Sequence, residues 1–481
     1  MISEKKYGRT KIVCTLGPAT STVEILVNLI HAGMDVARLN FSHGTHEEHL
    51  AMMERVREAS NITGEPISIL LDLQGPKIRT GKVKEPMVLR DGEQLVISIE
   101  DFLGEDHRIS TTYPDLPNDV QPGDTILMDD GLLQFTVLSK NEKEVVTKVV
   151  HGGILKSNKG INLPGIAVSA PSLSEKDKED VLFGIQHDID YIALSFVRTA
   201  SDVIHLRNFI IANIDKRKML PIIAKIEKDE ALKNIDEIIR EADGIMVARG
   251  DLGVECAPEE VPIAQKMIAR KANAAGKPVI IATQMLDSMI ENPRPTRAEA
   301  NDVANAVLDG ADAVMLSGET SIGKYPIETV KTMDNIIRRT ECEEGDKLSL
   351  EDSVEADEVS LSKALGRAAC VLAKQINAAA IISFTRSGQT VKTISRYRPT
   401  TQIIGIADRE RIQRRLNLIW GVRSLLITAS NTGETDTTIS NVMNELKNLG
   451  YIKAGDYVVL TAGIPLMSRN STNMIKAEKI Q

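Results

Sequence analysis

Acidic and basic side chains stand at the ends of short apolar runs in this sequence, where they could do chemistry together. Glu227 ends the run LPIIAKIE, Asp251 ends GIMVARGD, and Asp72 lies at the end of ISILLDL. Lys225 precedes Glu227 by two residues, so both side chains point to the same side of a strand. A buried lysine is costly unless it meets negative charge, which paired carboxylates or a phosphoryl group would supply. Two carboxylates can also bind Mg²⁺ and leave coordination positions for substrate oxygens.

Positively charged groups and backbone N–H groups complete this set. Arg38 in VARLNFS and Arg79 after the third run could each bind phosphate oxygens bidentately. The segment ARGDLG, residues 248–253, could hold a carboxylate on its N–H groups, and Thr283 in IIATQM offers a hydroxyl. The combination predicts metal-assisted phosphoryl transfer on a small substrate with a phosphate and a carboxylate. The alternative is that the carboxylates cap the following helices and Lys225 forms a structural salt bridge.

The elements that must position these residues are short runs rich in Val, Ile and Leu that alternate with helical segments. Such runs are typical of parallel strands buried on both faces. Eight of them predict a closed (β/α)8 TIM barrel, whose active site lies at the carboxyl ends of the strands. The eight runs are residues 11–17, 36–42, 67–73, 191–197, 220–227, 244–251, 278–284 and 313–319.

The spacing of the strands predicts two further domains. The long segment between the third and fourth runs alternates apolar and polar residues between Asp-Gly and Gly-Asp turns. This predicts an inserted all-β domain, an antiparallel β-barrel or sandwich, that acts as a lid. After an acidic linker, four more strand patterns at 379–385, 402–407, 422–428 and 457–463 alternate with helical ones, which predicts a doubly wound α/β domain. We expect the barrel at 1–81 and 171–344, the lid at 82–170 and the C-terminal domain at 345–481.

The amino-acid composition excludes some classes of protein and argues against others. The 481 residues are 42% hydrophobic and 26% charged, which excludes a disordered chain, and the net charge of −9 argues against a nucleic-acid-binding protein. The four cysteines have no CxxC spacing, so we expect free thiols. The sequence has no apolar signal region and no apolar stretch of about 18 residues. We therefore expect a cytoplasmic protein with no membrane partner.

Nucleotide-binding motifs are missing from the sequence. It has no GxGxxG, no GxxxxGK[ST] and no protein-kinase HRD or DFG set. A nucleotide is therefore expected between the barrel rim and the lid.

Long motifs along nearly the whole chain resemble those of the pyruvate kinase family. They include TKIVCTLGPAT, DVARLNFSHG, DLQGPKIRTG, NKGINLPG, IMVARGDLGVE, ATQMLDSM, RPTRAEANDVANAVLDGADAVMLSGET and GKYPIETV. The resemblance implies transfer of the phosphoryl group of phosphoenolpyruvate to ADP, which gives pyruvate and ATP in the last step of glycolysis. It also implies a Mg²⁺ (or Mn²⁺) cofactor, the same three domains and a homotetramer.

The resemblance also implies roles for individual residues. Glu227 and Asp251 would bind magnesium, Lys225 would stabilise the transferring phosphoryl group and the enolate, and Arg38 would contact the phosphoryl oxygens. The substrate carboxylate would be held by Gly250, Asp251 and Thr283. The nucleotide would be contacted by Asn40, His43, Arg79 and Lys159. Ser317 would lie near the proton relay to the enolate carbon, with the final proton donor left open between a side chain and a water held by Thr283.

One departure from the family pattern concerns a monovalent cation. Many members read DTKGPEIRTG where this chain reads DLQGPKIRTG, so Lys77 replaces a glutamate. Those members hold K⁺ at the positions that match Asn40, Ser42, Asp72 and the carbonyl of Leu73. A lysine ammonium could supply the charge of that ion, and we expect an enzyme that does not require K⁺. The alternative is that Lys77 points to solvent.

A second candidate site lies in the C-terminal domain. The segment TRSGQT follows a strand and opens a helix, which favours an anion site built from hydroxyl and N–H groups. It matches the family's allosteric sugar-phosphate loop and predicts an activator bound by Thr385, Ser387, Gly388, Gln389 and Thr390. The alternative is an ordinary capped helix.

Two other functions remain open at this stage. A magnesium-dependent lyase acting on pyruvate or oxaloacetate would share Glu227 and Asp251, although it would not need Arg79 or a lid. A non-catalytic metabolite sensor would use only the C-terminal loop, and in that case Lys225, Arg38 and Thr283 would not need to be present.

Overall fold

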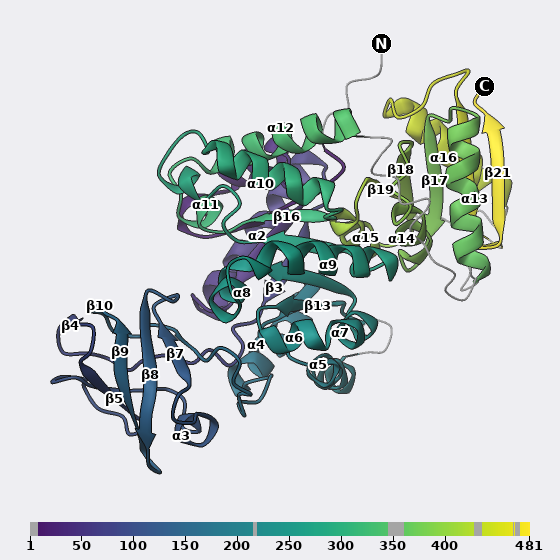
Figure 1. The fold of residues 1–481 in the computed structure, drawn as a ribbon. Helices are drawn as coiled ribbons and strands as arrows, with labels where there is room; N and C mark the ends of the chain where they lie inside the picture. Colours follow the sequence, from purple (N-terminus) through teal and green to yellow (C-terminus); the bar gives the residue numbers. More distant parts are fainter. Residues whose placement is uncertain (1–7, 215–218, 345–359, 428–434, 465, 467–471) are drawn as a thin grey trace.

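The computed structural model describes residues 8–214, 219–344, 360–427, 435–464, 466 and 472–481. Its centre is a closed barrel of parallel strands, which confirms the predicted fold class (Figure 1). Strand β1 pairs with β2 on one side and with β16 on the other, which closes the ring. The strands in barrel order are β1 (Lys11–Thr15), β2 (Val36–Asn40), β3 (Ser68–Asp72), β12 (Tyr191–Leu194), β13 (Ile222–Ile226), β14 (Gly244–Ala248), β15 (Val279–Ala282) and β16 (Ala313–Leu316).

Burial on both faces explains why these strands read as continuous apolar runs. Val13, Leu70 and Ile223 fill the barrel interior, whereas Ile12 and Ile69 pack outward against the surrounding helices. The helices around the barrel are α1 (Val23–Ala32), α2 (His46–Thr63), α4 (Glu175–Gln186), α5 (Ala200–Asn213), α6 (Asp229–Lys233), α7 (Ile235–Glu241), α8 (Arg249–Glu255), α9 (Glu260–Ala274), α10 (Arg297–Leu308), α11 (Gly318–Ser321) and α12 (Pro326–Glu344). Short 3₁₀ turns lie at Pro18–Thr20 and Asp287–Ile290.

The chain between β3 and β12 forms a separate β structure, at the lower left of Figure 1. Six strands pair in the order β11-β7-β8-β9-β5-β6, and β4 pairs with β10. The expected antiparallel pairing holds except for β5 and β6, which are parallel. The elements are β4 (Met87–Leu89), β5 (Gln94–Ser98), β6 (Arg108–Ser110), α3 (Leu116–Asp119), β7 (Thr125–Met128), β8 (Leu133–Lys140), β9 (Glu144–His151), β10 (Gly153–Leu155) and β11 (Ile161–Asn162).

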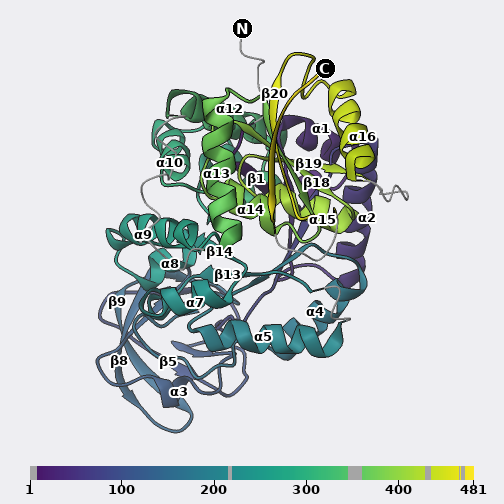
Figure 2. The same ribbon diagram turned by 90° about the vertical axis from the view of Figure 1, so that its right-hand side faces the viewer.

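The C-terminal domain is a five-stranded sheet with helices on both faces (Figure 2). The four predicted strands are parallel, and the edge is an antiparallel strand, β21, that the sequence patterns did not indicate. The elements are α13 (Leu361–Gln375), β17 (Ala380–Thr385), α14 (Gln389–Ser395), β18 (Gln402–Ala407), α15 (Glu410–Arg415), a 3₁₀ turn (Leu416–Leu418), β19 (Val422–Leu426), α16 (Thr435–Asn448), β20 (Tyr457–Ala462) and β21 (Met474–Lys479). Most of the predicted linker, 345–359, and the end of the third predicted strand, Thr428, lie outside the described residues.

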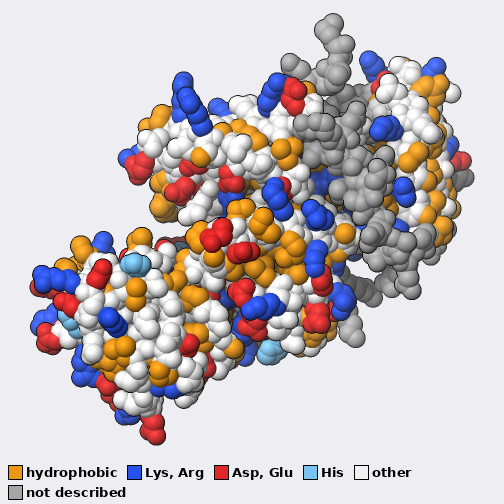
Figure 3. All heavy atoms as spheres, in the orientation of Figure 1, with side chains coloured by type: hydrophobic (Ala, Val, Ile, Leu, Met, Phe, Trp, Pro, Cys, Tyr) orange, Lys and Arg blue, Asp and Glu red, His pale blue; other side chains and the backbone are white. Residues whose placement is uncertain are grey.

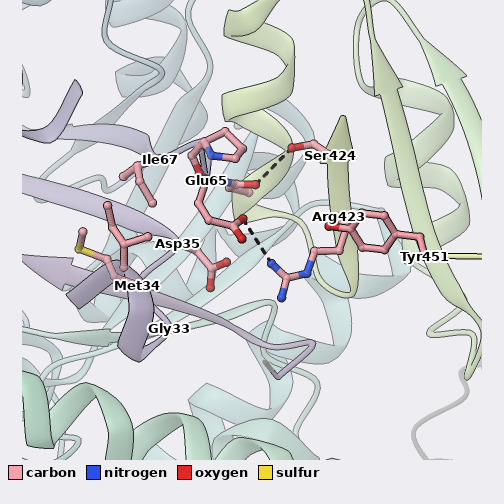
Figure 4. A pocket seen from close by; sticks show the side chains of 11 residues that line it. Gly33, Met34, Asp35, Glu65, Ile67, Arg423, Ser424 and Tyr451 are labelled. Atoms are coloured by element: carbon pink, nitrogen blue, oxygen red, sulfur yellow. Dashed lines mark hydrogen bonds and ion pairs between the residues drawn. The ribbon is translucent and has the colours of Figure 1, made fainter. Parts of the chain in front are cut away.

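The C-terminal domain contacts the barrel at the amino ends of its strands, away from the predicted active site. Figure 4 shows a pocket at this boundary, where Arg423 of β19 faces Glu65 at a distance of 3.8 Å. On the barrel side, the Lys11 ammonium lies 3.2 Å from Asp35 and donates to the carbonyl of Val422 at 2.9 Å. The Arg423–Glu65 ion pair and the hydrogen bond from Lys11 to Val422 join the two domains. In the part of the chain that the structure describes, no helix combines the length and apolar character needed to span a membrane.

Candidate active site

Four of the predicted residues form one charged network at the carboxyl ends of β2, β3 and β13. Arg38 donates its Nε–H to Asp72 Oδ2 at 2.7 Å and one terminal nitrogen to the hydroxyl of Thr15 at 2.8 Å. The Lys225 ammonium lies 3.2 Å from Asp72 Oδ1 and 3.0 Å from Glu227 Oε1. All four charged residues are buried. The structure therefore contains two cations and two carboxylates held together out of bulk water.

The charges in this network shift one another's pKa values. Burial alone would lower the pKa of Lys225, but the negative charges of Asp72 and Glu227 outweigh it and raise that pKa. Burial alone would raise the pKa of Asp72, whereas Lys225 and Arg38 lower it. Lys225 is therefore held as an ammonium and Asp72 as a carboxylate.

Glu227 lies near one cation, Lys225, and near a second carboxylate, Asp251. Burial raises its pKa, Lys225 counteracts that effect, and the charge of Asp251 raises the pKa further. Its Oε2 accepts the backbone N–H of Phe196 at 2.6 Å, with Phe196 in the left-handed region at φ 53°. Asp251 lies one strand away, in the first turn of α8. A buried carboxylate whose pKa is raised by a neighbouring carboxylate is a fitting place for a divalent cation.

The loops after β14 and β15 are joined by Thr283. Its hydroxyl accepts the backbone N–H of Gly250 at 2.8 Å and donates to the carbonyl of Ala282 at 2.6 Å. Thr283 has φ 69°, a backbone conformation that a β-branched residue rarely adopts. Arg249 holds the same loop by donating to the Thr283 carbonyl at 2.7 Å. Gly250, Asp251 and Thr283 are thus brought together.

Ser317 lies at the end of the last barrel strand. Its backbone N–H donates to Glu319 Oε2 at 2.6 Å, and its buried hydroxyl makes no hydrogen bond within the described residues. The structure gives Ser317 no contact with Lys225 or Thr283 that would assign it to the proton relay.

The residues predicted to meet a nucleotide come from two places: Arg79 and Lys159 lie where the inserted β domain joins the barrel, and Asn40 and His43 lie at the end of β2. Arg79 donates to the carbonyl of Asn158 at 3.1 Å, and Lys159 forms an ion pair with Asp129 at 2.7 Å. Asn40 accepts the N–H of Ser42 at 3.1 Å. His43, the remaining predicted contact, is exposed.

A cavity of about 470 Å³, including its open part, lies between the inserted domain and the barrel. It is lined by Lys77 from a joining segment, by Asn162 from β11 of the inserted domain, and by Lys228 and Asp251 from the barrel. Figure 3 shows that the molecular surface is hollowed between these two parts. Lys77 thus shares a cavity with Asp251, and no ion pair of Lys77 occurs among the described residues.

Sequence reasoning missed residues that position the network. Ser195 accepts a hydrogen bond from the Lys225 ammonium at 2.7 Å and donates to the carbonyl of Leu73 at 2.7 Å. Leu73 was a predicted monovalent-cation position, and its carbonyl is bonded here to Ser195. The one signal for Ser195 was a polar residue inside the apolar run YIALSFV.

Sequence reasoning also missed a group of hydrogen-bonded residues at the contact between the inserted domain and the barrel. Glu255, at the end of α8, accepts from Asn162 of β11 at 2.9 Å and from Lys228 at 2.6 Å. Because α8 also carries Asp251, the position of the inserted domain is tied to the helix that holds a candidate metal ligand.

The predicted effector residues lie in the C-terminal domain. The Thr385 hydroxyl accepts the N–H of Gly388 at 2.9 Å, and Gly388 precedes α14 with φ 85°. Gln389 donates to the Ser387 hydroxyl at 3.4 Å, and the hydroxyls of Thr390 and Thr472 are 2.7 Å apart. The five predicted residues thus lie close together at the end of β17, in the turn between β17 and α14 and in the first residues of α14. Part of the neighbouring segment resembling the family's loop, namely residues 465 and 467–471, lies outside the described residues.

Among the described residues no cluster of three or more His, Cys, Asp or Glu side chains has the geometry of a metal site. Glu227 and Asp251 are only two carboxylates, and they would need substrate oxygens or water to complete the coordination of Mg²⁺, which commonly keeps such ligands. The residues present therefore fit a magnesium ion shared with a substrate.

Comparison with known proteins agrees with this geometry. Family models of the pyruvate kinase barrel domain and the pyruvate kinase alpha/beta domain match residues 7–330 and 363–477. A pyruvate kinase from Geobacillus stearothermophilus is 49% identical over 98% of this chain and 80% of its own length. One from Staphylococcus haemolyticus is 47% identical over 97% of this chain and 80% of its own length. The crystal structure of a pyruvate kinase from Cryptosporidium parvum superposes with a TM-score of 0.92 at 38% identity, covering 99% of this chain and 97% of the other. This chain therefore belongs to the pyruvate kinase family, a family of phosphoryl-transferring enzymes.

Proposed function

We propose that this enzyme transfers the phosphoryl group of phosphoenolpyruvate to ADP and so produces pyruvate and ATP, the last step of glycolysis. The observation that carries the proposal is the buried network of Arg38, Asp72, Lys225 and Glu227, which presents two cations beside a candidate metal site. Phosphoryl transfer needs this kind of fixed positive charge, because negative charge spreads over the oxygens of the transferring group.

In the proposed mechanism the phosphoryl group lies against Arg38 and Lys225. The Lys225 ammonium, held by Ser195 and two carboxylates, neutralises charge on the phosphoryl oxygens and then on the enolate oxygen. Asp72 keeps both cations in position. A Mg²⁺ or Mn²⁺ ion held by Glu227 and Asp251 would supply further positive charge to the oxygens of the substrate.

The substrate carboxylate is proposed to bind at the Gly250–Asp251–Thr283 loop, where N–H groups of the first turn of α8 favour an anion. Binding there fixes the orientation of the enolate carbon relative to Thr283. The Thr283 hydroxyl, or a water that it holds, is the proposed route of the proton to that carbon, with Ser317 nearby in the chain of donors.

The nucleotide is proposed to bind between the barrel and the inserted domain. Asn40, His43, Arg79 and Lys159 are the proposed contacts, and the open cavity between the two parts supports this placement. The hydrogen bond from Asn162 of the inserted domain to Glu255 of the barrel favours closure of the inserted domain over the bound substrates.

Three finer properties are part of the proposal. Lys77 supplies positive charge in place of K⁺, so activity does not require a monovalent cation at Asn40, Ser42, Asp72 and Leu73. A sugar phosphate binds the loop formed by Thr385, Ser387, Gly388, Gln389 and Thr390 and activates the enzyme. The enzyme works as a cytoplasmic homotetramer, with its barrel at 1–81 and 171–344, its lid at 82–170 and its C-terminal domain at 345–481. The four free cysteines are compatible with that compartment.

The test is the initial rate of pyruvate formation from phosphoenolpyruvate and ADP with Mg²⁺, with K⁺ present and absent and with a panel of sugar phosphates. Pyruvate formation that depends on ADP is expected. Cleavage of oxaloacetate without any ADP-dependent reaction would instead favour the lyase, and the absence of both reactions would favour a metabolite sensor.

A further inference from the structure

A small cavity lies between the C-terminal domain and the barrel, on the opposite side of the barrel from the active site. Its walls come from α14, from the end of α9 and from the residues that precede β15 and β16. Its empty space is about 250 Å³, including its opening. Figure 1 shows α14 close to the end of α9, and Arg396 makes a hydrogen bond to the carbonyl of Ala274 there.

Three cationic side chains line this cavity: Lys277, Lys392 and Arg396. The Lys277 ammonium already has a hydrogen-bond partner, because it donates to the carbonyl of Ala242 at 2.6 Å, just beyond the end of α7. The ammonium of Lys392 makes no hydrogen bond or ion pair with any residue that the structure describes. The Nε–H of Arg396 is also buried without a partner among those residues, and the residue is more than nine-tenths buried.

The neighbouring acidic groups are bound to other partners. Asp312, the one carboxylate in the wall, pairs with Arg398 at 3.2 Å and accepts the N–H of Val279 at 3.0 Å. Asp243 pairs with Arg207 at 3.0 Å. The wall therefore carries three basic side chains against one carboxylate, and that carboxylate is already paired with a fourth basic side chain, Arg398.

The neutral polar groups of the wall do not offset this excess of basic side chains, because they are hydrogen-bonded elsewhere. Ser395 donates its hydroxyl to the carbonyl of Trp420 at 2.7 Å, and Asn273 is bonded to Gly310 and Arg398. Burial lowers the pKa of Lys392; Asp243 counteracts that effect, and the charge of Lys277 lowers the pKa further. A buried cation without a partner is unfavourable, so the site is best suited to a ligand that brings negative charge.

We propose that this cavity binds a small tetrahedral oxyanion, namely inorganic phosphate or the phosphate group of a small phosphate ester, through Lys392 and Arg396. A guanidinium and an ammonium together match the oxygens of such an ion. The cavity is too small for a nucleotide and is separate from the loop at Thr385–Thr390. Because α14 begins at that loop and ends at this cavity, the anion would fix α14 against the barrel.

Crystals of the full-length enzyme soaked in selenate would locate the anion by its anomalous signal. We expect a peak between Lys392 and Arg396 in the wild type, no peak there in Lys392→Met, and unchanged selenate peaks elsewhere. Lys374→Met, an exposed lysine of α13, is the matched control and should keep the peak. Wild-type crystals that show selenate elsewhere but none in this cavity would overturn the proposal.

Thermal unfolding in solution gives a second readout. Without phosphate or sulfate, Lys392→Met should unfold at a higher temperature than the wild type, because it lacks the uncompensated charge. Adding sulfate should stabilise the wild type and Lys374→Met at concentrations at least about tenfold lower than it stabilises Lys392→Met. Equal responses of all three proteins would contradict the proposal. If Lys392→Met does not fold, Lys392→Gln serves in its place.

Competition distinguishes the two sources of the phosphate group. A sugar monophosphate that removes the selenate peak from this cavity would identify an ester as the ligand. If only inorganic phosphate removes the peak, the ligand is the free ion.

Discussion

The hydroxyl of Thr283 accepts the backbone N–H of Gly250 at 2.8 Å, and this bond connects the loops that follow two neighbouring barrel strands. Thr283 makes the bond from a left-handed backbone conformation, φ 69°, which costs a β-branched residue about 1–3 kcal/mol. A strained residue at the end of a barrel strand is typical of a position kept for function.

Substitution of Thr283 separates the role of its hydroxyl from the effect of strain. Thr283→Ser keeps the hydroxyl and is expected to retain kcat within about threefold, whereas Thr283→Ala should lose about 100-fold. The serine variant should also unfold at an equal or higher temperature, because serine is not β-branched. Steady-state kinetics and thermal unfolding check both expectations, and equal activity of the two variants would mean that the hydroxyl has no role.

Removal of one carboxylate tests the metal site. Asp251→Asn should reduce kcat on the order of 1000-fold and leave the unfolding temperature nearly unchanged, because Asp251 is only partly buried. Asp229→Asn, in the first turn of α6, is the matched control and should remain active. If Asp251→Asn keeps wild-type turnover, the metal has been assigned to the wrong residues.

If Lys77 takes the place of K⁺, removal of Lys77 should make the enzyme require K⁺. The wild type should be active in buffer free of K⁺ and Na⁺, and Lys77→Glu should lose most of that activity and regain it when K⁺ is added. Lys156→Glu, an exposed lysine of the inserted domain, should behave as the wild type. If the wild-type enzyme is inactive in K⁺-free buffer, the proposed role of Lys77 is wrong, but the assigned reaction is not affected.

Asp119 in the inserted domain predicts a pH-dependent contribution to stability. Partial burial would raise its pKa, but hydrogen bonds from the hydroxyl and N–H of Ser169 and from Tyr113 lower it. A lowered pKa in the folded state stabilises the protein above the ordinary value of 3.8, and this stability is lost as pH falls through the lowered value.

Asp119→Asn should therefore cost about 1–2 kcal/mol of unfolding free energy at pH 7, after allowing for partial exposure. The difference from the wild type should shrink as the pH falls below 3.8. Urea unfolding at several pH values measures this difference. Asp101→Asn, an exposed residue of the same domain, is the control, and a difference independent of pH would rule out the ionised carboxylate as its cause.

The barrel could be predicted because each of its strands is buried on both faces, so its sequence is a continuous apolar run ended by polar residues. Strand β21 was missed for the opposite reason. It lies at a sheet edge, and its residues Met474–Lys479 alternate around charged side chains that carry little strand signal. The parallel pairing of β5 with β6 was also missed, because residue types do not determine which strands become neighbours.

The candidate site could be predicted as a set of residue types but not as a network. Lys225 and Glu227 were paired correctly because the two-residue period of a strand places them on one side. The contact of Lys225 with Asp72, and the hydrogen bond from Phe196 to Glu227, depend on the order of strands in the closed ring, where β12 lies between β3 and β13. The left-handed conformations of Phe196 and Thr283 have no signal in their residue types, since both disfavour that conformation.

The closure of the barrel has a consequence for the synthesis of the protein. Strand β1 pairs with β16, so Lys11 reaches its partner Ala313 only after about 300 further residues have been made. At about 5–20 residues per second, β1 keeps an unpaired edge on the ribosome for roughly 15 to 60 seconds. The inserted strands β4 to β11 pair only with one another and can complete their sheets during that interval. The nascent chain is thus most exposed to aggregation through its first strand, and a chaperone that covers residues 11–15 until release would have the largest effect on its yield.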